Sequence, residues 1–586
     1  MIAFIKKQKL NLLLLLVIAL IACCFIREKE GYHMDELLSF ELANADFTPW
    51  IVPTQPEGRL EKFLREQVYG DSFFETCGNF FGVVGDVLTN RGNAVIFQTV
   101  ADVYDEPVWI TRQQFTDYIT VNGQDAFHYP SVYFNVKDDN HPPLHFMMLH
   151  TMSSLFRGQV NPWLGCVLNL LFVLGSCFLM IRLGKRFFGS ESLGRGMAIL
   201  YALSLGGMST ILLIRMYAML TFWCVAALYL HLEKWKSSLW KNHNKLLIFV
   251  TVCGFLTQYF FLLIMLPLFA VTMVMLIRER KTEGSNPKNP LYYLRTMVCS
   301  GIWGLVLYPF AIDDVLNSGR GQESLENLTG GFSGTLERAR QFFAIWCEEI
   351  FGNVAGIPVI LILLLLAVWI LVTRRNREEG SGQRTGAAPA NETEKDSVKC
   401  LWFLGVPLAF YILVVTRIAP FYEDRYMMPA YAFAAMVMGY VFFRAVKKLG
   451  FKERWFVVLC LVLTIPMLVI QTPNYLFKGY ETQQNVAETH RDLPCVCVYD
   501  GLSYYRNLVE FTEYEQTLLV KTQELEHRSY DAVLDTKEEI VLMTGRGVEP
   551  EDAFAALEAY GYTDYTPLLE EGIYGDRIWL ASKGRN

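Results

Sequence analysis

One acidic pair in this sequence stands close behind the first long apolar run. Asp35 and Glu36 follow the run Leu10 to Ile26 within the segment His33-Met34-Asp35-Glu36-Leu37. A carboxylate at a membrane surface can take the proton of an attacking hydroxyl, and such general-base assistance contributes about 10²–10⁴ in rate. Asp35 is therefore our candidate base and Glu36 a second candidate catalytic residue. The alternatives are that the pair is solvated charge and that Glu36 only orients a helix start.

Cationic side chains occur at three other junctions between apolar runs. They lie before Pro142-Pro143-Leu144, in Arg215-Met216-Tyr217, and in Asp424-Arg425-Tyr426. An arginine fork matches the oxygens of a phosphate group well. We predict that four of these side chains bind a phosphate and that three neighbours position the ligand: Arg215, Arg425, His141 and Lys137 for the first role, and Tyr217, Tyr426 and Asp139 for the second.

Each of these candidates has a simpler alternative. Arg215 and Arg425 could be interfacial anchors that reach lipid headgroups. His141 could cap the turn that Pro142-Pro143 begins. Asp138 and Asp139 with His141 contain the residue types of a divalent metal site, but their spacing is not diagnostic. We therefore predict no definite cofactor and keep a divalent metal as an alternative.

The composition requires a lipid environment for the elements that position these groups. Of the 586 residues, 52% are hydrophobic and only 19% are charged. Runs of about 18 or more apolar residues, which a helix needs to cross a bilayer, recur down most of the chain. The net charge of -7 excludes a broad nucleic-acid surface. The chain is thus predicted to be an all-α polytopic membrane protein.

Positive charge assigns the ends of these runs to one side of the membrane. Basic clusters recur at every second junction, as the positive-inside rule requires. The clusters begin at Arg182, Lys234, Arg278, Arg374 and Arg444. The later charge-free runs are Trp163 to Ile181, Met197 to Ile214, Met216 to Leu232, Leu246 to Ile277, Thr296 to Ile312, Gly352 to Thr373, Cys400 to Thr416, Tyr426 to Phe443 and Trp455 to Thr472.

Two segments do not fit one span each. Leu246 to Ile277 is too long and has basic residues at both ends, so we expect two crossings with Thr257-Gln258-Tyr259 at the outer turn. Pro142 to Phe156 is too short to cross, so we expect a re-entrant or interfacial helix. The result is about eleven transmembrane helices, with the N-terminus cytoplasmic and the C-terminus extracytoplasmic.

The rest of the chain divides into loops and a small terminal domain. Residues 1–472 form the predicted membrane domain, with outer loops at 27–141, which should hold interfacial helices, and 313–351, and a disordered cytoplasmic loop at 374–399. In residues 473–586 four short apolar runs, 495–499, 517–520, 540–543 and 578–581, alternate with helical patterns such as 551–560. We predict a small extracytoplasmic α/β domain there.

The motifs above resemble those of the GT-C fold glycosyltransferases, in particular the protein O-mannosyltransferase and aminoarabinose transferase branch. The shared features are an early Asp-Glu pair, His141-Pro142-Pro143-Leu144 before a short helix, Arg215-Met216-Tyr217-Ala218, and Arg425-Tyr426 before a span. The resemblance covers residues 1 to about 472. The chain departs from it in two places: His141 stands where the aminoarabinose branch has lysine, and His145-Phe146 stand where the mannosyltransferases have Gly-Lys.

The resemblance implies a polyprenyl-phosphate sugar donor, an inverting transfer, and Asp35 as the base. The sugar would be mannose or another hexose or pentose, and the acceptor an extracytoplasmic hydroxyl of a glycan, lipid or protein. Because a lipid phosphate leaves already ionised, one carboxylate suffices for this reaction and no strong general acid is needed. We expect the walls that select sugar and acceptor to lie in residues 44–136.

Two other functions remain open. A multi-span transporter or lipid flippase of glycoconjugates would also need many spans, but it would place polar residues near the middle of the bilayer rather than in loops. A non-catalytic assembly or sensor protein would use the C-terminal domain. The expected partners are the donor, the acceptor and membrane lipids, with no nucleic acid. Short loops favour a bacterial plasma membrane over the endoplasmic reticulum.

Overall fold

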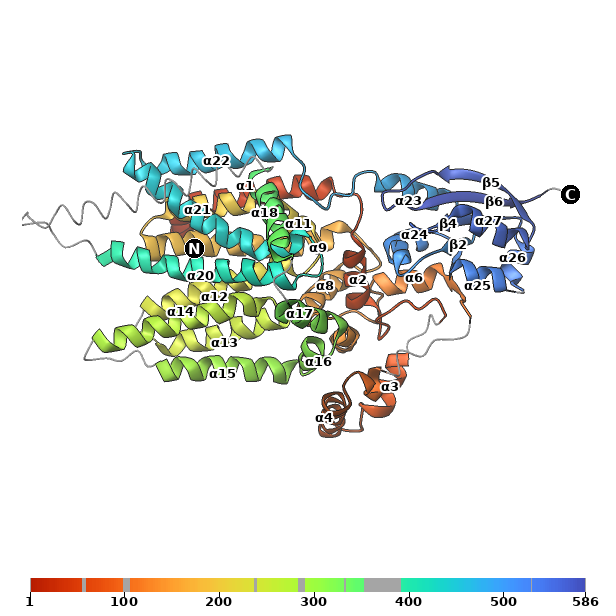
Figure 1. The fold of residues 1–586 in the computed structure, drawn as a ribbon, viewed down its shortest axis with the longest axis horizontal. Helices are drawn as coiled ribbons and strands as arrows, with labels where there is room; N and C mark the ends of the chain where they lie inside the picture. Colours follow the sequence, from red (N-terminus) through yellow and green to blue (C-terminus); the bar gives the residue numbers. More distant parts are fainter. Residues whose placement is uncertain are drawn as a thin grey trace, which may run out of the picture. The chain divides into compact units, whose positions relative to one another are not determined.

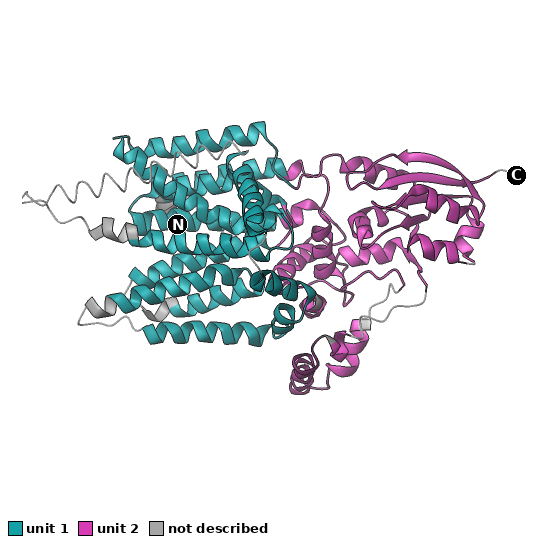
Figure 2. Ribbon diagram, in the orientation of Figure 1, with its two compact units in different colours: residues 1–25, 166–212, 216–474 teal, residues 26–165, 213–215, 475–586 magenta. Residues whose placement is uncertain are grey.

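The computed structural model describes residues 2–54, 59–97, 106–236, 240–282, 290–330, 334–352, 392–528 and 530–584. Most of them are helical, and strands are concentrated in the C-terminal part (Figure 1). The chain forms two compact units, each built from several stretches that alternate along the sequence (Figure 2). Unit 1 comprises 1–25, 166–212 and 216–474, and unit 2 comprises 26–165, 213–215 and 475–586.

Unit 1 is a bundle of long apolar helices. Six helices of the described residues are long and apolar enough to cross a membrane, and a bent pair makes a seventh candidate. The six lie in α1 (Ile2–Arg27), α9 (Pro162–Phe188), α14 (Phe261–Thr282), α20 (Glu392–Ile418), η3 with α21 (Asp424–Met427 and Met428–Lys448) and α22 (Glu453–Ile470). The chain is thus an integral membrane protein.

The remaining predicted spans have different outcomes. The run 216–232 corresponds to helix α12 (Tyr217–Lys236), and the run 296–312 extends past the end of helix α15 (Pro290–Leu307); neither helix is among the six. The run 352–373 lies outside the described residues from 353 onwards, and so does the loop 374–399 as far as 391. Residues 392–399, predicted to be disordered, instead form the beginning of helix α20, so that part of the prediction is wrong. The number eleven and the sidedness of the ends therefore stay predictions. The loop 313–351 forms α16 (Ala311–Leu316), α17 (Gly319–Thr329) and α18 (Thr335–Phe351).

The long run 246–277 breaks where its length and flanking charges predict. Helix α13 (Trp240–Thr257) ends at the expected turn, and α14 begins at Phe261, after three intervening residues. Main-chain bonds from Gln258 to Gly254 (3.2 Å) and from Phe261 to Gln258 (3.0 Å) close the turn. The predicted break at 257–259 is confirmed.

The bent pair leads directly into the junction that carries Arg215. Helices α10 (Glu191–Ala202) and α11 (Leu205–Leu212) meet at 63°. Ser204 begins the second helix, because its hydroxyl accepts the main-chain N–H of Gly207 at 3.0 Å. A Cβ at Gly207 would lie 2.0 Å from the carbonyl oxygen of Tyr201, so only glycine fits this bend.

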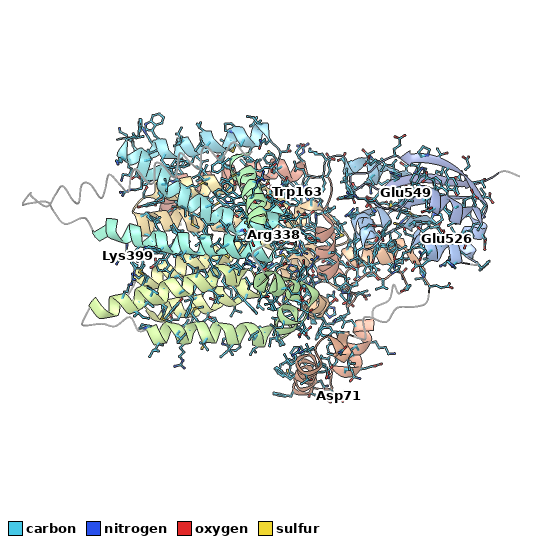
Figure 3. The ribbon with its side chains drawn as sticks, viewed as in Figure 1. Asp71, Trp163, Arg338, Lys399, Glu526 and Glu549 are labelled. Carbon is cyan, nitrogen blue, oxygen red and sulfur yellow. The ribbon has the colours of Figure 1, made fainter. Side chains whose placement is uncertain are left out.

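A partly buried arginine closes the end of α20. Arg338, labelled in Figure 3, extends from α18, and its guanidinium donates to the carbonyl oxygens of Thr416, at 2.9 Å from Nε, and Ala419. The last carbonyls of a helix have no partner within the helix, and a cation satisfies them well. Arg338 therefore ties the 335–351 helix to the segment that precedes Asp424.

In unit 2 the first large loop is mainly helical. Its elements are α2 (Met34–Asn44), α3 (Arg59–Gln67), α4 (Phe73–Asn90), η1 (Arg91–Asn93), β1 (Trp109–Thr111), α6 (Arg112–Ile119), α7 (Tyr129–Asn135), η2 (Val136–Asp138) and α8 (Leu144–Leu155). Helix α2 packs against α6, α7 and α8. With 12 residues, α8 is about 18 Å long, which confirms a helix too short to cross.

A six-stranded sheet with helices completes unit 2. The strands are β2 (Cys495–Val498), β3 (Gln516–Val520), β4 (Glu539–Thr544), β5 (Tyr562–Leu569) and β6 (Arg577–Lys583), together with β1, in the order β1-β3-β2-β4-β6-β5. The parallel pairs of β2 with β3 and with β4 lie at its centre. The other elements are α23 (Tyr480–Thr489), η4 (Ser503–Asn507), α24 (Leu508–Phe511), α25 (Thr522–His527), α26 (Ala532–Thr536) and α27 (Pro550–Glu558).

Strand β1 comes from the first loop and not from the C-terminal segment. It pairs antiparallel with β3, with Trp109 opposite Leu518. The indole of Trp109 donates to Asp531 at 2.9 Å. The first loop and residues 475–584 therefore share one sheet, although the sequence suggests a boundary near 472.

A buried carboxyl in this unit predicts a stability that depends on pH. Glu510 is fully buried and accepts the hydroxyl of Tyr480 at 2.8 Å. Burial raises the pKa of Glu510 from 4.5 to about 8. The folded protein therefore holds a proton that the unfolded chain releases, and the contribution is complete below pH 4.5 and lost as pH rises to about 8.

We expect the thermal midpoint of the purified full-length protein in detergent to fall between pH 5 and 8 more steeply in the wild type than in Glu510→Gln. The glutamine side chain is neutral at every pH and removes this one titration. Differential scanning fluorimetry at half-unit steps measures the two slopes. Equal slopes in the two proteins would show that Glu510 titrates normally.

Candidate functional site

The start of α2 presents Asp35 on a well-defined helix end. His33 is the N-cap, and its Nδ1 accepts the main-chain N–H of Asp35 at 3.1 Å. The Asp35 side chain is 21% exposed, and its Oδ2 lies 3.7 Å from the same imidazole nitrogen. Acidic residues are favourable in a first helical turn. Asp35 thus remains accessible while the helix behind it is fixed.

Glu36 is wholly buried and bound through both oxygens. Oε2 accepts the main-chain N–H of His33 at 2.6 Å and the ammonium of Lys29 at 3.1 Å. Oε1 accepts the main-chain N–H of Ile214 at 2.6 Å. Burial raises the pKa of Glu36, and Lys29 and the two N–H groups oppose that rise. These contacts are those of a group that positions its neighbours.

Arg215 lies against the first turns of α2. Its Nη1 donates to the carbonyl oxygen of Asp35 at 3.1 Å and to the hydroxyl of Ser39 at 2.8 Å. The residue is 6% exposed. Its Nε is buried, and it has no hydrogen-bond partner among the described residues. The structure therefore brings Arg215 to the helix turn of Asp35 and Glu36, although 180 residues separate Arg215 from Asp35 in the sequence.

The motif before α8 contributes three of the predicted residues. His141 and Asp139 form a pair, with Nδ1 and Oδ2 3.1 Å apart and both side chains mostly buried. Lys137 is 1% exposed, with its ammonium 5.2 Å from the ring centre of Phe97. The side chain of Asp138 lies outside the described part.

His145, on the first turn of α8, is a further polar group near Arg215. It is fully buried, and among the described residues neither ring nitrogen has a hydrogen-bond partner. Burial, with the charges of Arg215 and His141, lowers the pKa of His145 to about 3. The imidazole is therefore neutral at ordinary pH, so it can donate and accept hydrogen bonds but cannot bind a phosphate as a cation.

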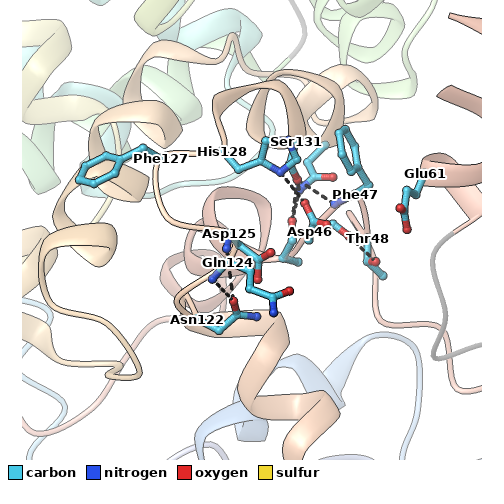
Figure 4. Close-up of polar contacts among 12 residues, drawn as sticks. Asp46, Phe47, Thr48, Glu61, Asn122, Gln124, Asp125, Phe127, His128 and Ser131 are labelled. Atoms are coloured by element: carbon cyan, nitrogen blue, oxygen red, sulfur yellow. Dashed lines mark hydrogen bonds and ion pairs between the residues drawn. The ribbon is translucent and has the colours of Figure 1, made fainter. Parts of the chain in front are cut away.

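A second polar cluster lies in the same loop (Figure 4). His128 Nδ1 and Asp46 Oδ1 are 2.9 Å apart, and Asn122 Oδ1 accepts the main-chain N–H of Asp125 at 3.2 Å. Burial raises the pKa of Asp125, with a further contribution from Asp46. This cluster belongs to residues 44–136, in which we expect the walls that recognise sugar or acceptor.

The remaining predicted residues belong to unit 1. Tyr217 begins α12, and Arg425 and Tyr426 lie in η3. All three residues are buried. The guanidinium carbon of Arg425 is 5.4 Å from the ring centre of Tyr426. Because Asp35 belongs to the other unit, a pocket shared by Asp35 and Arg425 stays a prediction.

Beside Arg425, unit 1 contains a buried acid pair that the sequence did not reveal. The amide of Asn474 donates to Glu349 at 2.8 Å and to Asp424 at 3.0 Å, and Ser209 donates to Glu349 at 3.2 Å. Burial raises the pKa of Glu349, and Asp424 adds to that effect. The signal available in the sequence was weak, because the residues come from four distant segments.

The sequence analysis also did not identify Lys29 and Ser39, both in unit 2, as residues of the candidate site. Lys29 stands just after the first span, on the side that the sequence predicts to be outer, where the positive-inside rule disfavours a lysine. That exception was the available clue to a buried ion pair.

A metal site is not visible in the part of the protein that the structure describes. Within the described residues there is no group of three or more histidine, cysteine, aspartate or glutamate side chains that could hold a metal ion. The divalent metal considered for Asp138, Asp139 and His141 is not tested by this, because the side chain of Asp138 lies outside the described residues.

Comparison with known proteins finds only distant likeness. No protein-family model matches the chain, and no curated protein matches it. A crystal structure of ArnT from Cupriavidus metallidurans bound to undecaprenyl phosphate has a TM-score of 0.45 and 11% identity, covering 80% of this chain and 92% of that one. The same protein in the apo state gives 0.40 and 10%, covering 80% and 91%.

A likeness of this size does not assign an activity or a substrate. In structure the chain is distantly similar to ArnT over most of its length.

Proposed function

We propose that the chain is a membrane glycosyltransferase that takes a sugar from a polyprenyl-phosphate donor and passes it to a hydroxyl acceptor. The observation that carries this proposal is the contact of Arg215 with the first turns of α2, which carry Asp35. A cation beside an accessible carboxylate is the minimum that this reaction needs. The cation holds the leaving phosphate, and the carboxylate takes the acceptor proton.

In this reaction Asp35 is the general base and Arg215 the donor-phosphate ligand. The hydroxyl oxygen attacks the anomeric carbon from the face opposite the phosphate, the carbon–oxygen bond to the phosphate breaks, and the proton goes to Asp35. The configuration at the anomeric carbon is inverted. The buried Glu36 positions the helix start and does not touch the substrate. His141 is a candidate for a second phosphate contact, because it and Arg215 both lie close enough to His145 to lower its pKa. Lys137, Arg425, Tyr217, Tyr426 and Asp139 stay predictions.

The sugar is a hexose or pentose, and the acceptor is a hydroxyl of a glycan, lipid or protein on the extracytoplasmic side. The polar cluster of Asp46, Asp125 and His128 suits recognition of sugar hydroxyls, because partly exposed carboxylates and imidazoles bond them well. We place the protein in a bacterial plasma membrane with its N-terminus cytoplasmic.

Two measurements on the purified full-length protein test this proposal. Mass spectrometry of its lipid extract should find a co-purifying polyprenyl-phosphate sugar. That donor, made radioactive, should then lose its sugar to water or acceptor in detergent, where no second compartment exists. A transporter or flippase would instead leave the donor intact in detergent and move it only across sealed vesicles.

A further inference from the structure

The segment Tyr475–Tyr480, here called the strap, runs along the residues that precede Asp35. The main-chain N–H of Glu30 donates to the carbonyl oxygen of Leu476 at 2.9 Å, and Lys478 forms an ion pair with Glu28. A Cβ at Gly31 would lie 2.7 Å from the ring of Tyr480, so the approach is as close as the backbone allows. The strap thus fixes residues 28–31.

The strap has a strained backbone. Tyr475 and Phe477 adopt φ angles of 71° and 49°, in the left-handed region that non-glycine residues avoid. Such residues persist only where the surrounding contacts determine the conformation, and they are concentrated at functional sites. The strain indicates that the position of the strap is held by tertiary contacts rather than by local preference.

Lys29 connects the strap to α2. Its side chain is completely buried, and its ammonium donates to the carbonyl oxygen of Tyr475 at 2.8 Å and to Glu36 at 3.1 Å. The same ammonium lies 4.9 Å from the ring centre of Phe477. A buried ammonium is costly unless its partners are well placed, so Lys29 and its partners constrain one another.

Glu36 passes this constraint on to the candidate site. Its other oxygen holds the main-chain N–H of Ile214, and the next residue, Arg215, holds the carbonyl oxygen of Asp35. One buried ion pair therefore fixes both the turn that carries the base and the backbone that carries the phosphate ligand.

We propose that Lys29 is a positioning residue for sugar transfer, and that the strap acts through Lys29 to hold Asp35 and Arg215 in register. This gives the C-terminal part of unit 2 a role in catalysis, because the strap begins it. The inference rests on the proposed function. Lys29 has no contact with the substrate in this account, so its loss should lower kcat more than it raises the donor KM.

The test uses full-length protein in detergent at a temperature where every variant stays folded. Lys29→Met should lower kcat roughly 10- to 100-fold, since a misplacement of about 1 Å costs up to 10²-fold, and should change the donor KM less than threefold. Lys29→Arg, which retains the charge, should recover most of the loss. Lys29→Met combined with Glu36→Gln should be no worse than Glu36→Gln alone, because both substitutions break the same ion pair and only Glu36→Gln also disturbs the bonds to the main-chain N–H groups of His33 and Ile214.

The matched control is Lys537→Met, which removes an exposed ion pair with Glu515 in the same unit (2.6 Å, with the lysine 37% exposed). It should leave kcat unchanged. A Lys29→Met protein with wild-type kcat would overturn the inference, as would additive losses in the double variant. Failure of the wild type itself to bind undecaprenyl phosphate or turn over a donor would instead overturn the proposed function.

Discussion

Asp35→Asn is expected to lower sugar transfer by about 10²–10⁴-fold while the protein still inserts and binds its donor. Asparagine has nearly the same shape, and the substitution leaves the main-chain N–H of Asp35 and its bond to the N-cap His33 unchanged. What the substitution removes is the capacity to accept a proton from the acceptor hydroxyl. The loss should therefore appear in kcat, with the donor KM close to that of the wild type.

The measurement is the initial rate of transfer from the radioactive donor, with undecaprenyl phosphate binding as the check on the donor site. Glu41→Gln is the matched control, because Glu41 lies on the same helix and is fully buried. Burial raises the pKa of Glu41 well above its usual range, so the neutral amide of glutamine is a conservative replacement at this position. Retained turnover in Asp35→Asn would exclude Asp35 as the base.

Local patterns in the sequence predicted much of the fold. The excess length of 246–277, with basic residues at both ends, predicted the break before Phe261, and the short run 142–156 predicted α8. In the C-terminal part, four apolar runs predicted β2, β3, β4 and β6. These features are set by hydrophobic length and period, which neighbouring residues determine.

Non-local pairing could not be predicted in the same way. Strand β1 has only three residues, and its partner β3 lies some 400 residues further along the chain. Strand β5 was missed because its exposed, polar positions resemble a loop. Both elements depend on a sheet that the rest of the chain must first build.

In the candidate site, too, the features set by neighbouring residues could be predicted and those set by distant residues could not. Residue type and position indicated Asp35 and Arg215, and the structure places them in contact through a main-chain carbonyl. The sequence did not separate the roles of Asp35 and Glu36, because what distinguishes these two adjacent carboxylates is how deeply each is buried in the folded protein. That difference arises from Lys29 and Ile214, which meet Glu36 only in the folded chain.

Arg215→Met is the second substitution with a large expected effect, and it should act on donor binding. A hydrogen bond to a charged group contributes about 1.5–3 kcal/mol, which corresponds to roughly 10- to 150-fold in affinity. We expect the Kd for undecaprenyl phosphate to rise by this factor. Arg215→Lys should fall between the two proteins, because it keeps the charge but loses the fork that grips two oxygens.

The same variant should also lower kcat, because Arg215 holds the carbonyl oxygen of Asp35 and the hydroxyl of Ser39. Ser39→Ala separates the binding of phosphate by Arg215 from the positioning of Asp35. It removes the hydroxyl that accepts a hydrogen bond from the guanidinium and leaves the charge of Arg215 in place. It should therefore lower kcat more than it weakens the binding of undecaprenyl phosphate. Arg157→Met is the matched control, since Arg157 is exposed just past the end of α8, where it donates to the carbonyl oxygen of Ser154 at 3.2 Å. An Arg215→Met protein that binds undecaprenyl phosphate as tightly as the wild type would show that the guanidinium is an architectural group, and that the phosphate is held elsewhere.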